Sequence, residues 1–308
     1  MDFRDAVFDT LRTIMRNDPT VVITTNDMNA MLLDEIREEM PDRVINIGIA
    51  EQNLISVSGG LAQSGKKVFV FAIVSHVIGR GWEQIKLDVC TMNLPVTILG
   101  VGPGLSYGND GPTHHGTEDL ALTRVLPNMT IFNPCDSNSM IAAVKLSHVI
   151  EGPAYIRIDR EKIVSIHSEN ANLTPGFKVW REGTKLALVT TGVITHRVLE
   201  AARRLEASGV DCQVVELYQL KPINSKDIVT AFGGAERIVV IDEHSPVGGL
   251  ATIVAEAMVR EGIAKPMEVV SLPDQFLLGS SSRDWAHETY GLSVTKLESH
   301  LKTLVIAP

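Results

Sequence analysis

Short apolar runs alternate with amphipathic segments along most of this chain, and no other feature of the sequence restricts its fold as strongly. The apolar runs are predicted to be buried strands: "TVVITT" (20–25), "KVFVFAIV" (67–74), "PVTILGVG" (95–102), "MTIFNP" (129–134) and "PAYIRI" (153–158). Apolar residues at helical spacing mark the segments between them, such as residues 50–65 and 78–92. Strands that alternate with helices form a parallel sheet covered on both faces, so the sequence predicts a doubly wound α/β domain.

A polar stretch, "HSENANLTPG" (167–176), interrupts this alternation, which restarts at "KLALVTT" (185–191). The sequence therefore predicts a first domain over residues 1–165, a linker over 166–183 and a smaller α/β domain over 184–308. A length of 308 residues agrees with two domains rather than one.

Charge and cysteine content exclude several classes of protein. A formal net charge of -9 argues against a surface for nucleic acid or anionic membrane. No apolar run approaches the roughly 18 residues that a membrane span needs. The three cysteines form no CxxC pair, so we expect a cytoplasmic protein without a structural zinc site or a disulfide framework.

Two features point to chemistry at one edge of the first sheet. Ligands of parallel sheets bind beyond the carboxyl ends of the strands, and a long loop over residues 100–116 leaves one of those ends. It carries Asp110, His114 and His115, and we expect it to be functional. Glu51 opens a helix after Gly48, where it is either a first-turn charge that the helix dipole stabilises or an acid held for catalysis.

Taken together, these motifs are more specific than any of them alone. "NIGIAEQN" (46–53) and "GNDGPTHHGTEDLALTRV" (108–125) resemble the pyrimidine-binding domain of the transketolase family. "DEHSPVGGLATIVAEAMVREG" (242–262) resembles the C-terminal domain of the same family. The resemblance implies a transferase that uses thiamine diphosphate to move a two-carbon ketol unit from a ketose to an aldose.

The sequence contains no match to the family's N-terminal domain, whose GDG…N motif holds the diphosphate through Mg²⁺. The chain therefore resembles the C-terminal subunit of a split transketolase. The resemblance implies that the Mg²⁺ ligands lie on an N-terminal partner subunit, in an α2β2 assembly.

The resemblance also implies roles for single residues around the cofactor. Glu51 matches the glutamate that contacts N1′ of the aminopyrimidine, and we expect an apolar pocket to keep its carboxyl group mostly protonated. Met28 matches the hydrophobic wedge that bends the cofactor, and Asp27 lies beside it.

Other matches concern the substrate, which the resemblance implies is a sugar or a sugar phosphate. Asp110 and His114 match residues that face the substrate hydroxyls and the cofactor, so His114 is a candidate catalytic residue with Glu51. Arg160 matches an arginine that often grips a sugar phosphate, a role that suits the paired donors of a guanidinium.

The sequence departs from the family at three positions. Val77 stands where an aromatic ring usually lies against the pyrimidine, with Arg80 three residues on, as in deoxyxylulose-phosphate synthase. Gly102 replaces a histidine, either for backbone reasons or because the pocket is more open there. The loop also reads THH where THQ is usual, which adds His115.

Two other functions stay open at this point. The β subunit of a 2-oxoacid dehydrogenase E1 has a similar size and layout, although DGPTHH speaks against it. A non-catalytic transketolase-like partner protein would explain the missing aromatic ring and histidine, but not the presence of Glu51, Asp110 and His114.

Overall fold

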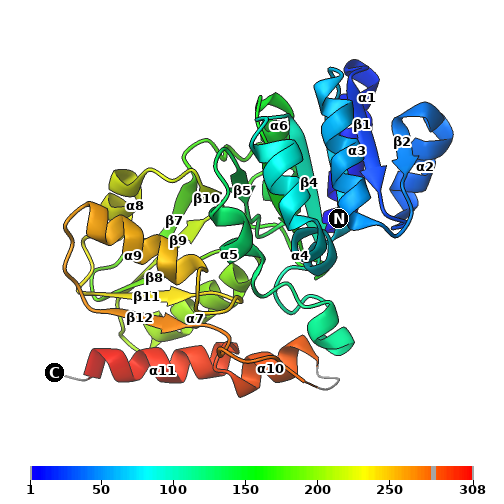
Figure 1. The fold of residues 1–308 in the computed structure, drawn as a ribbon. Coiled ribbons are helices and arrows are strands. Elements are labelled where there is room, and N and C mark those ends of the chain that lie inside the picture. The colour runs from blue at the N-terminus through cyan, green and yellow to red at the C-terminus, as the bar shows by residue number, and fades with distance from the viewer. Residues whose placement is uncertain (1, 279–281, 307–308) are drawn as a thin grey trace.

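Two mainly parallel sheets form the framework of the protein in a computed structural model that describes residues 2–278 and 282–306 (Figure 1). The first has seven strands in the order β10-β5-β6-β4-β3-β1-β2 and the second has five in the order β12-β11-β8-β9-β7. The predicted fold, a doubly wound α/β domain followed by a smaller α/β domain, is confirmed.

Five strands of the first sheet follow the predicted apolar runs: β1 (Val21–Thr25), β3 (Lys67–Ile73), β4 (Val96–Val101), β5 (Thr130–Phe132) and β6 (Ala154–Ile158). Both of its faces are covered, which explains why the runs are continuously apolar. Val68 and Val70 of β3 join one core cluster, whereas Phe69 and Phe71 join the other. Its helices are α1 (Phe3–Asn17), α2 (Met31–Glu39), α3 (Glu51–Gln63), α4 (Val74–Gln84), α5 (Asp119–Arg124) and α6 (Ser137–Val149).

The second unit has the strands β7 (Phe177–Arg181), β8 (Leu186–Thr190), β9 (Cys212–Leu217), β11 (Arg237–Ile241) and β12 (Met267–Val270). Its helices are α7 (Ile194–Ala207), α8 (Ser225–Phe232), α9 (Leu250–Arg260), α10 (Arg283–Thr289) and α11 (Val294–Ile306). The last two lie together along one side of this unit in Figure 1.

Three strands lie outside the predicted pattern. β2 (Val44–Asn46) is a short edge strand that pairs parallel with β1. β7 pairs antiparallel with β9, so the second sheet begins at Phe177, inside the range that the sequence predicts as a linker. β10 (Gln219–Lys221) comes from the second half of the chain but pairs antiparallel with β5. It covers the edge of the first sheet, where the backbone groups of β5 would otherwise lack partners.

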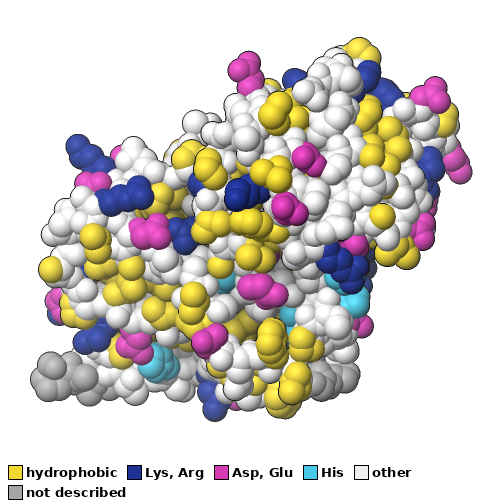
Figure 2. Space-filling view, in the orientation of Figure 1, with side chains coloured by type: hydrophobic (Ala, Val, Ile, Leu, Met, Phe, Trp, Pro, Cys, Tyr) yellow, Lys and Arg dark blue, Asp and Glu magenta, His cyan; other side chains and the backbone are white. Residues whose placement is uncertain are grey.

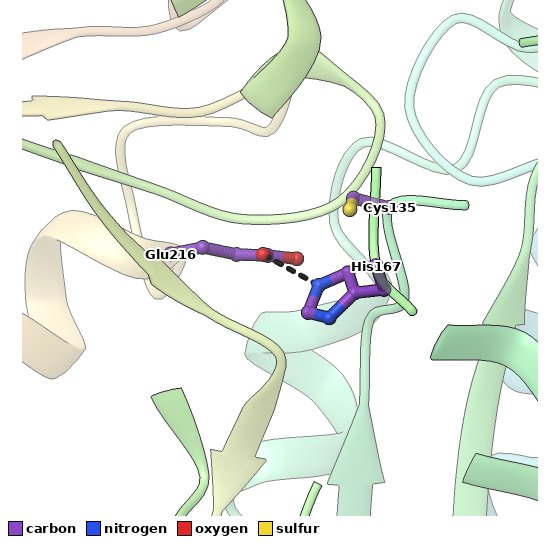
Figure 3. A group of neighbouring side chains, drawn as sticks. All are labelled: Cys135, His167 and Glu216. Atoms are coloured by element: carbon purple, nitrogen blue, oxygen red, sulfur yellow. Dashed lines mark hydrogen bonds and ion pairs between the residues drawn. The ribbon is translucent and has the colours of Figure 1, made fainter. Parts of the chain in front are cut away.

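Buried polar side chains join the two units. Three of these side chains converge: Cys135 after β5, His167 in the connecting segment and Glu216 of β9 (Figure 3). The atoms that each could offer to a metal ion lie within 4.8 Å of one another. His167 Nε2 lies 2.9 Å from Glu216 Oε2, and Trp180 Nε1 donates to the same oxygen at 2.7 Å. Such groups also bind transition metals; here both contacts fall on Oε2 of Glu216, and Oε1 has no hydrogen-bond partner in the described part of the chain. In this structure the cluster is a hydrogen-bonded joint.

A second buried pair lies under the long loop that follows β4. Arg157 of β6 donates to both carboxylate oxygens of Asp119, at 2.8 and 3.0 Å, and to the carbonyl of Gly116 at 3.2 Å. The Tyr155 hydroxyl donates to Asp119 as well. Burial alone would lower the pKa of Arg157, but Asp119 and its neighbours raise it above its usual value. The guanidinium therefore stays charged and fixes the base of the loop.

We predict that Arg157→Met lowers the free energy of unfolding by about 3–5 kcal/mol, because Asp119 would be left buried without its partner. Lys185→Met is the matched control: the Lys185–Glu236 pair is about as short, at 2.6 Å, but its side chains are 50% and 65% exposed. Its loss should cost less than about 1 kcal/mol. Urea unfolding of both variants tests the prediction, which fails if the two costs are equal.

Candidate active site

Glu51 begins α3, and it is buried although the segment just before the helix is exposed. The residue is 4% exposed, whereas Ile49 two positions earlier is 75% exposed. The Asn26 amide donates to Oε1 at 3.1 Å, and Arg80 Nη1 lies 3.1 Å from both carboxylate oxygens. A cavity of about 400 Å³, lined also by Ile49, Gln52 and Arg80, opens next to the carboxylate. A molecule from solution can therefore reach Glu51.

The charge state of Glu51 differs from the sequence-based expectation. Burial raises the pKa of its carboxyl group, but the Glu51 backbone N–H, Arg80 and Asn26 outweigh that effect and lower it. The expectation that an apolar pocket keeps Glu51 protonated is wrong for this chain in this structure, because the groups facing the carboxylate are polar or cationic. Glu51 is ionised here, and the start of the helix adds to that preference.

Asp27 and Met28 follow Asn26, the residue at the end of β1 that donates to this carboxylate. Asn46 holds the turn: its side-chain oxygen accepts from the backbone N–H groups of Asp27 and Gly48 at 2.9 and 3.0 Å. Its amide donates to the Asp27 carboxylate at 3.0 Å. Asp27 is exposed with φ of 69°, and Met28 is half-buried against the core.

Arg80 and the unpredicted His76 share the cavity side of α4. His76 Nδ1 lies 3.9 Å from Glu51 Oε1, and its Nε2 lies 3.1 Å from the carbonyl oxygen of Thr113. Burial, Arg80 and His114 lower the pKa of His76, so its ring is neutral near neutral pH. Val77 is fully buried in the core, and its side chain therefore faces away from the cavity.

The loop that follows β4 is closed at its neck. Gly104 N donates to Gly116 O at 2.7 Å, and Gly116 N donates to Gly104 O at 3.0 Å. Leu105 N donates to Glu243 of the second unit at 3.2 Å. A 3₁₀ turn over Gly108–Thr113 forms the tip, where Asp110 is exposed. The second unit thus braces the loop that carries the predicted site residues.

His114 connects the loop to α4 and to Tyr107. No sequence motif had indicated Tyr107. The ring centroid of His114 lies 5.0 Å from that of His76 and 5.5 Å from that of Tyr107. Thr113 Oγ1 lies 2.9 Å from His114 Nδ1. Arg160, from the segment after β6, places its guanidinium 4.2 Å from the centre of the Tyr107 ring.

The space beside Gly102 is not open. A Cβ atom on Gly102 would lie 2.1 and 2.2 Å from two carbon atoms of the Tyr107 ring, and the residue has φ of 88°. The expectation of a more open pocket at Gly102 is therefore wrong, because an aromatic ring from the same loop occupies the place. His115 is buried, with Nε2 3.0 Å from the carbonyl oxygen of Gly108, and it supports the loop rather than the cavity.

These contacts form a continuous series of neighbouring side chains: Glu51, His76, His114, Tyr107 and Arg160. Four of the five come from segments that follow β2, β3 and β4, and Arg160 follows β6, so all lie beyond the carboxyl ends of parallel strands. Histidine and basic side chains gather between α4 and the loop on the face shown in Figure 2. The series offers an acid, two imidazoles and a cation, which suffices for proton transfer and for binding a polar, anionic ligand.

Comparison with known proteins identifies the family. Residues 1–164 match the transketolase pyrimidine-binding domain and residues 176–297 match the transketolase C-terminal domain. The chain belongs to the transketolase family. The transketolase relatives include an apulose-4-phosphate transketolase subunit of Phocaeicola vulgatus, which is 32% identical over 94% of this chain and 93% of its own length. A 6-deoxy-6-sulfo-D-fructose transketolase subunit of a Clostridium species is 31% identical over 96% of this chain and 91% of its own length.

Solved transketolase structures agree. A split-gene transketolase described as an inactive β4 tetramer has a TM-score of 0.88 and 32% identity, over 99% of this chain and 98% of that one. The transketolase of Campylobacter jejuni, at 19% identity and a TM-score of 0.80, shares the fold over 46% of its own length. This chain is therefore the C-terminal subunit of a transketolase, a transferase. The similarity does not favour a 2-oxoacid dehydrogenase subunit or a non-catalytic partner.

The transketolase subunit has no helix, within the part of the chain that the structure describes, with the length and apolar character of a membrane span.

We predict that Gly102→Ala destabilises the protein by about 1–3 kcal/mol through overlap with Tyr107, in addition to about 1–2 kcal/mol for a positive φ. Gly209→Ala is the control, since Gly209 has φ of 79° but no atom within 4 Å of an added Cβ. In a Tyr107→Gly background, Gly102→Ala should cost no more than this control. Chemical unfolding of the four variants measures the coupling, and additive costs at residues 102 and 107 would contradict the prediction.

Proposed function

We propose that this transketolase subunit works with thiamine diphosphate and transfers a two-carbon ketol unit from a ketose to an aldose. The observation that carries the proposal is the series from Glu51 to Arg160, which lines up an acid, two imidazoles and a cation beyond the strand ends. Such a series serves an extended polar substrate better than a single bound ion.

The residues around Glu51 fit the pyrimidine end of this cofactor. The carboxylate is buried but open to a cavity, and the side chain of Arg80, its main partner, is 55% exposed and can turn away. Thiamine diphosphate, when bound, supplies a carbanion for attack on the ketose carbonyl and holds the electron pair between the two half-reactions. Glu51 binds N1′ of the aminopyrimidine, and Asp27 and Met28 lie beside the ring.

Arg80 determines when Glu51 can exchange a proton. While Arg80 is paired with it, the carboxylate is ionised. If Arg80 turns away and a ring covers the cavity, the carboxylate loses a cation and water together, and both changes raise its pKa. Glu51 then holds or releases the proton at N1′. The ion pair in the free chain is therefore compatible with an acid–base role.

His114, His76 and Asp110 serve the substrate. The Nε2 atom of His114 has no hydrogen-bond partner within residues 2–278 and 282–306, and Thr113 already engages its Nδ1. His76 is neutral and borders both His114 and Glu51. The imidazoles bind the sugar hydroxyls and move protons to or from them, while Arg160 receives an anionic end group such as a phosphate.

The diphosphate and Mg²⁺ are held by an N-terminal partner subunit in an α2β2 assembly. The sequence lacks a GDG…N motif, and several relatives are named as transketolase subunits. Cys90, Cys135 and Cys212 are all free and buried, which fits a reducing cytoplasm.

The purified chain is expected to be inactive by itself, because the groups that anchor a diphosphate through Mg²⁺ come from its partner. Addition of the N-terminal subunit should restore both ketol transfer and calorimetric binding of thiamine diphosphate, and light scattering should show two copies of each subunit. Tight cofactor binding by the single chain, or full activity in a one-to-one complex, would contradict this.

Glu51→Gln should lower the rate of the reconstituted enzyme by on the order of 10²-fold or more, because an amide cannot exchange the proton. Circular dichroism should show an unchanged fold. Glu83→Gln is the control, since Glu83 is an exposed glutamate on α4. Activity of Glu51→Gln close to that of the control would mean that Glu51 is only a first-turn charge.

A further inference from the structure

The Tyr107 ring and Gly102 form one unit within the loop. Two ring atoms lie where a Cβ of Gly102 would stand, so the ring packs directly on the glycine backbone. Tyr107 is half-buried and packs against the core of the first sheet. Its hydroxyl forms no hydrogen bond with any of the residues that the structure describes. The ring is therefore fixed by packing, while its polar end is available.

Arg160 lies over the face of this ring, and its guanidinium is not committed to a carboxylate among the described residues. Its guanidinium is 4.2 Å from the ring centre, and its hydrogen bonds to Ser106 and Asp159 use the backbone N–H only. No carboxylate in the described part of the chain pairs with its side chain.

Arg160 lines a cavity together with three other arginines, and those three are paired with carboxylates. The cavity of about 470 Å³ is also lined by Arg4, Arg197 and Arg283. Each of these three pairs with a carboxylate: Arg4 with Asp2, Arg197 with Asp284, and Arg283 with Asp159, Glu161 and Glu243. Neutralised arginines attract an anion weakly, so Arg160 is the arginine best placed to bind one.

We propose, on the basis of the proposed function, that Tyr107 determines the preference of this subunit for aldoses with an anionic end group. The ring closes the space beside Gly102, and its face holds the Arg160 guanidinium by a cation–π contact so that the donors point into the cavity. Burial raises the pKa of Tyr107, so the phenol keeps its proton. Tyr107 is thus a specificity-determining residue that acts largely by positioning Arg160.

Kinetics with two acceptors separate this role from simple packing. In the reconstituted enzyme, Tyr107→Leu fills part of the space but removes the aromatic face. It should lower kcat/KM for D-ribose 5-phosphate about tenfold more than kcat/KM for D-ribose, mainly through KM. Tyr107→Phe keeps the aromatic face and should behave like wild type. Tyr290→Leu, at a half-buried tyrosine of the second unit, is the matched control. An equal loss with both acceptors, or no loss with either, would overturn the proposal.

A binding measurement tests the same role without activity. In NMR spectra of the full chain with labelled arginine, the Arg160 Nε signal is identified by its loss in Arg160→Lys. Inorganic phosphate should shift it in wild type and Tyr107→Phe, whereas Tyr107→Leu should need about tenfold more phosphate. The proposal fails if phosphate leaves the wild-type signal unchanged or if its Kd is the same in Tyr107→Leu. Should the wild-type complex transfer no ketol unit, the proposed function is wrong, and the phosphate titration still decides the role of Tyr107.

Discussion

The buried pair of Arg157 and Asp119 is the interaction on which the candidate site depends most. It joins β6 to the start of α5 and, through the carbonyl of Gly116, holds the base of the loop that carries His114 and Tyr107. Two charges buried together are stable only when their geometry and remaining hydrogen bonds are complete. The hydroxyl of Tyr155 supplies one of those bonds, so the pair fixes a position rather than merely adding stability.

The second unit supports this loop without giving a side chain to the series of site residues. Glu243 accepts from Leu105 N and is held by Arg283, which also donates to Asp159 next to Arg160. Burial raises the pKa of Glu243, but Arg283 and His287 outweigh it and keep the carboxylate ionised. One arginine of the second unit thus supports both the loop after β4 and the segment that carries Arg160. This arrangement gives the C-terminal domain a physical role in holding the candidate site in place.

The sequence predicts the parallel sheet and the region of the site because both follow from local patterns. Apolar runs buried on both faces mark the strands, and the positions of Glu51 and His114 follow from short motifs. Features that depend on where the backbone turns after a strand have no such local pattern and were not predicted. α4 begins at Val74, inside an apolar run that reads as a strand, and this start turns Val77 into the core and His76 toward Glu51. The spacing of His76 four residues before Arg80 was the available signal. β10 gave no signal, because its pairing with β5 joins residues about ninety positions apart.

Gly102 shows how a comparison of single positions can mislead. A glycine where related enzymes have a histidine looks like the loss of a side chain. In this loop, five residues further on, Tyr107 returns to the same place, and its ring fits only because Gly102 has no Cβ. The positive φ of Gly102 gives the loop the backbone turn that precedes the return of the ring. Gly102 and Tyr107 therefore form one packing unit, in which the missing side chain makes room for a ring whose face lies against Arg160. A histidine at position 102 could not coexist with that ring, so the identity of either residue constrains the other.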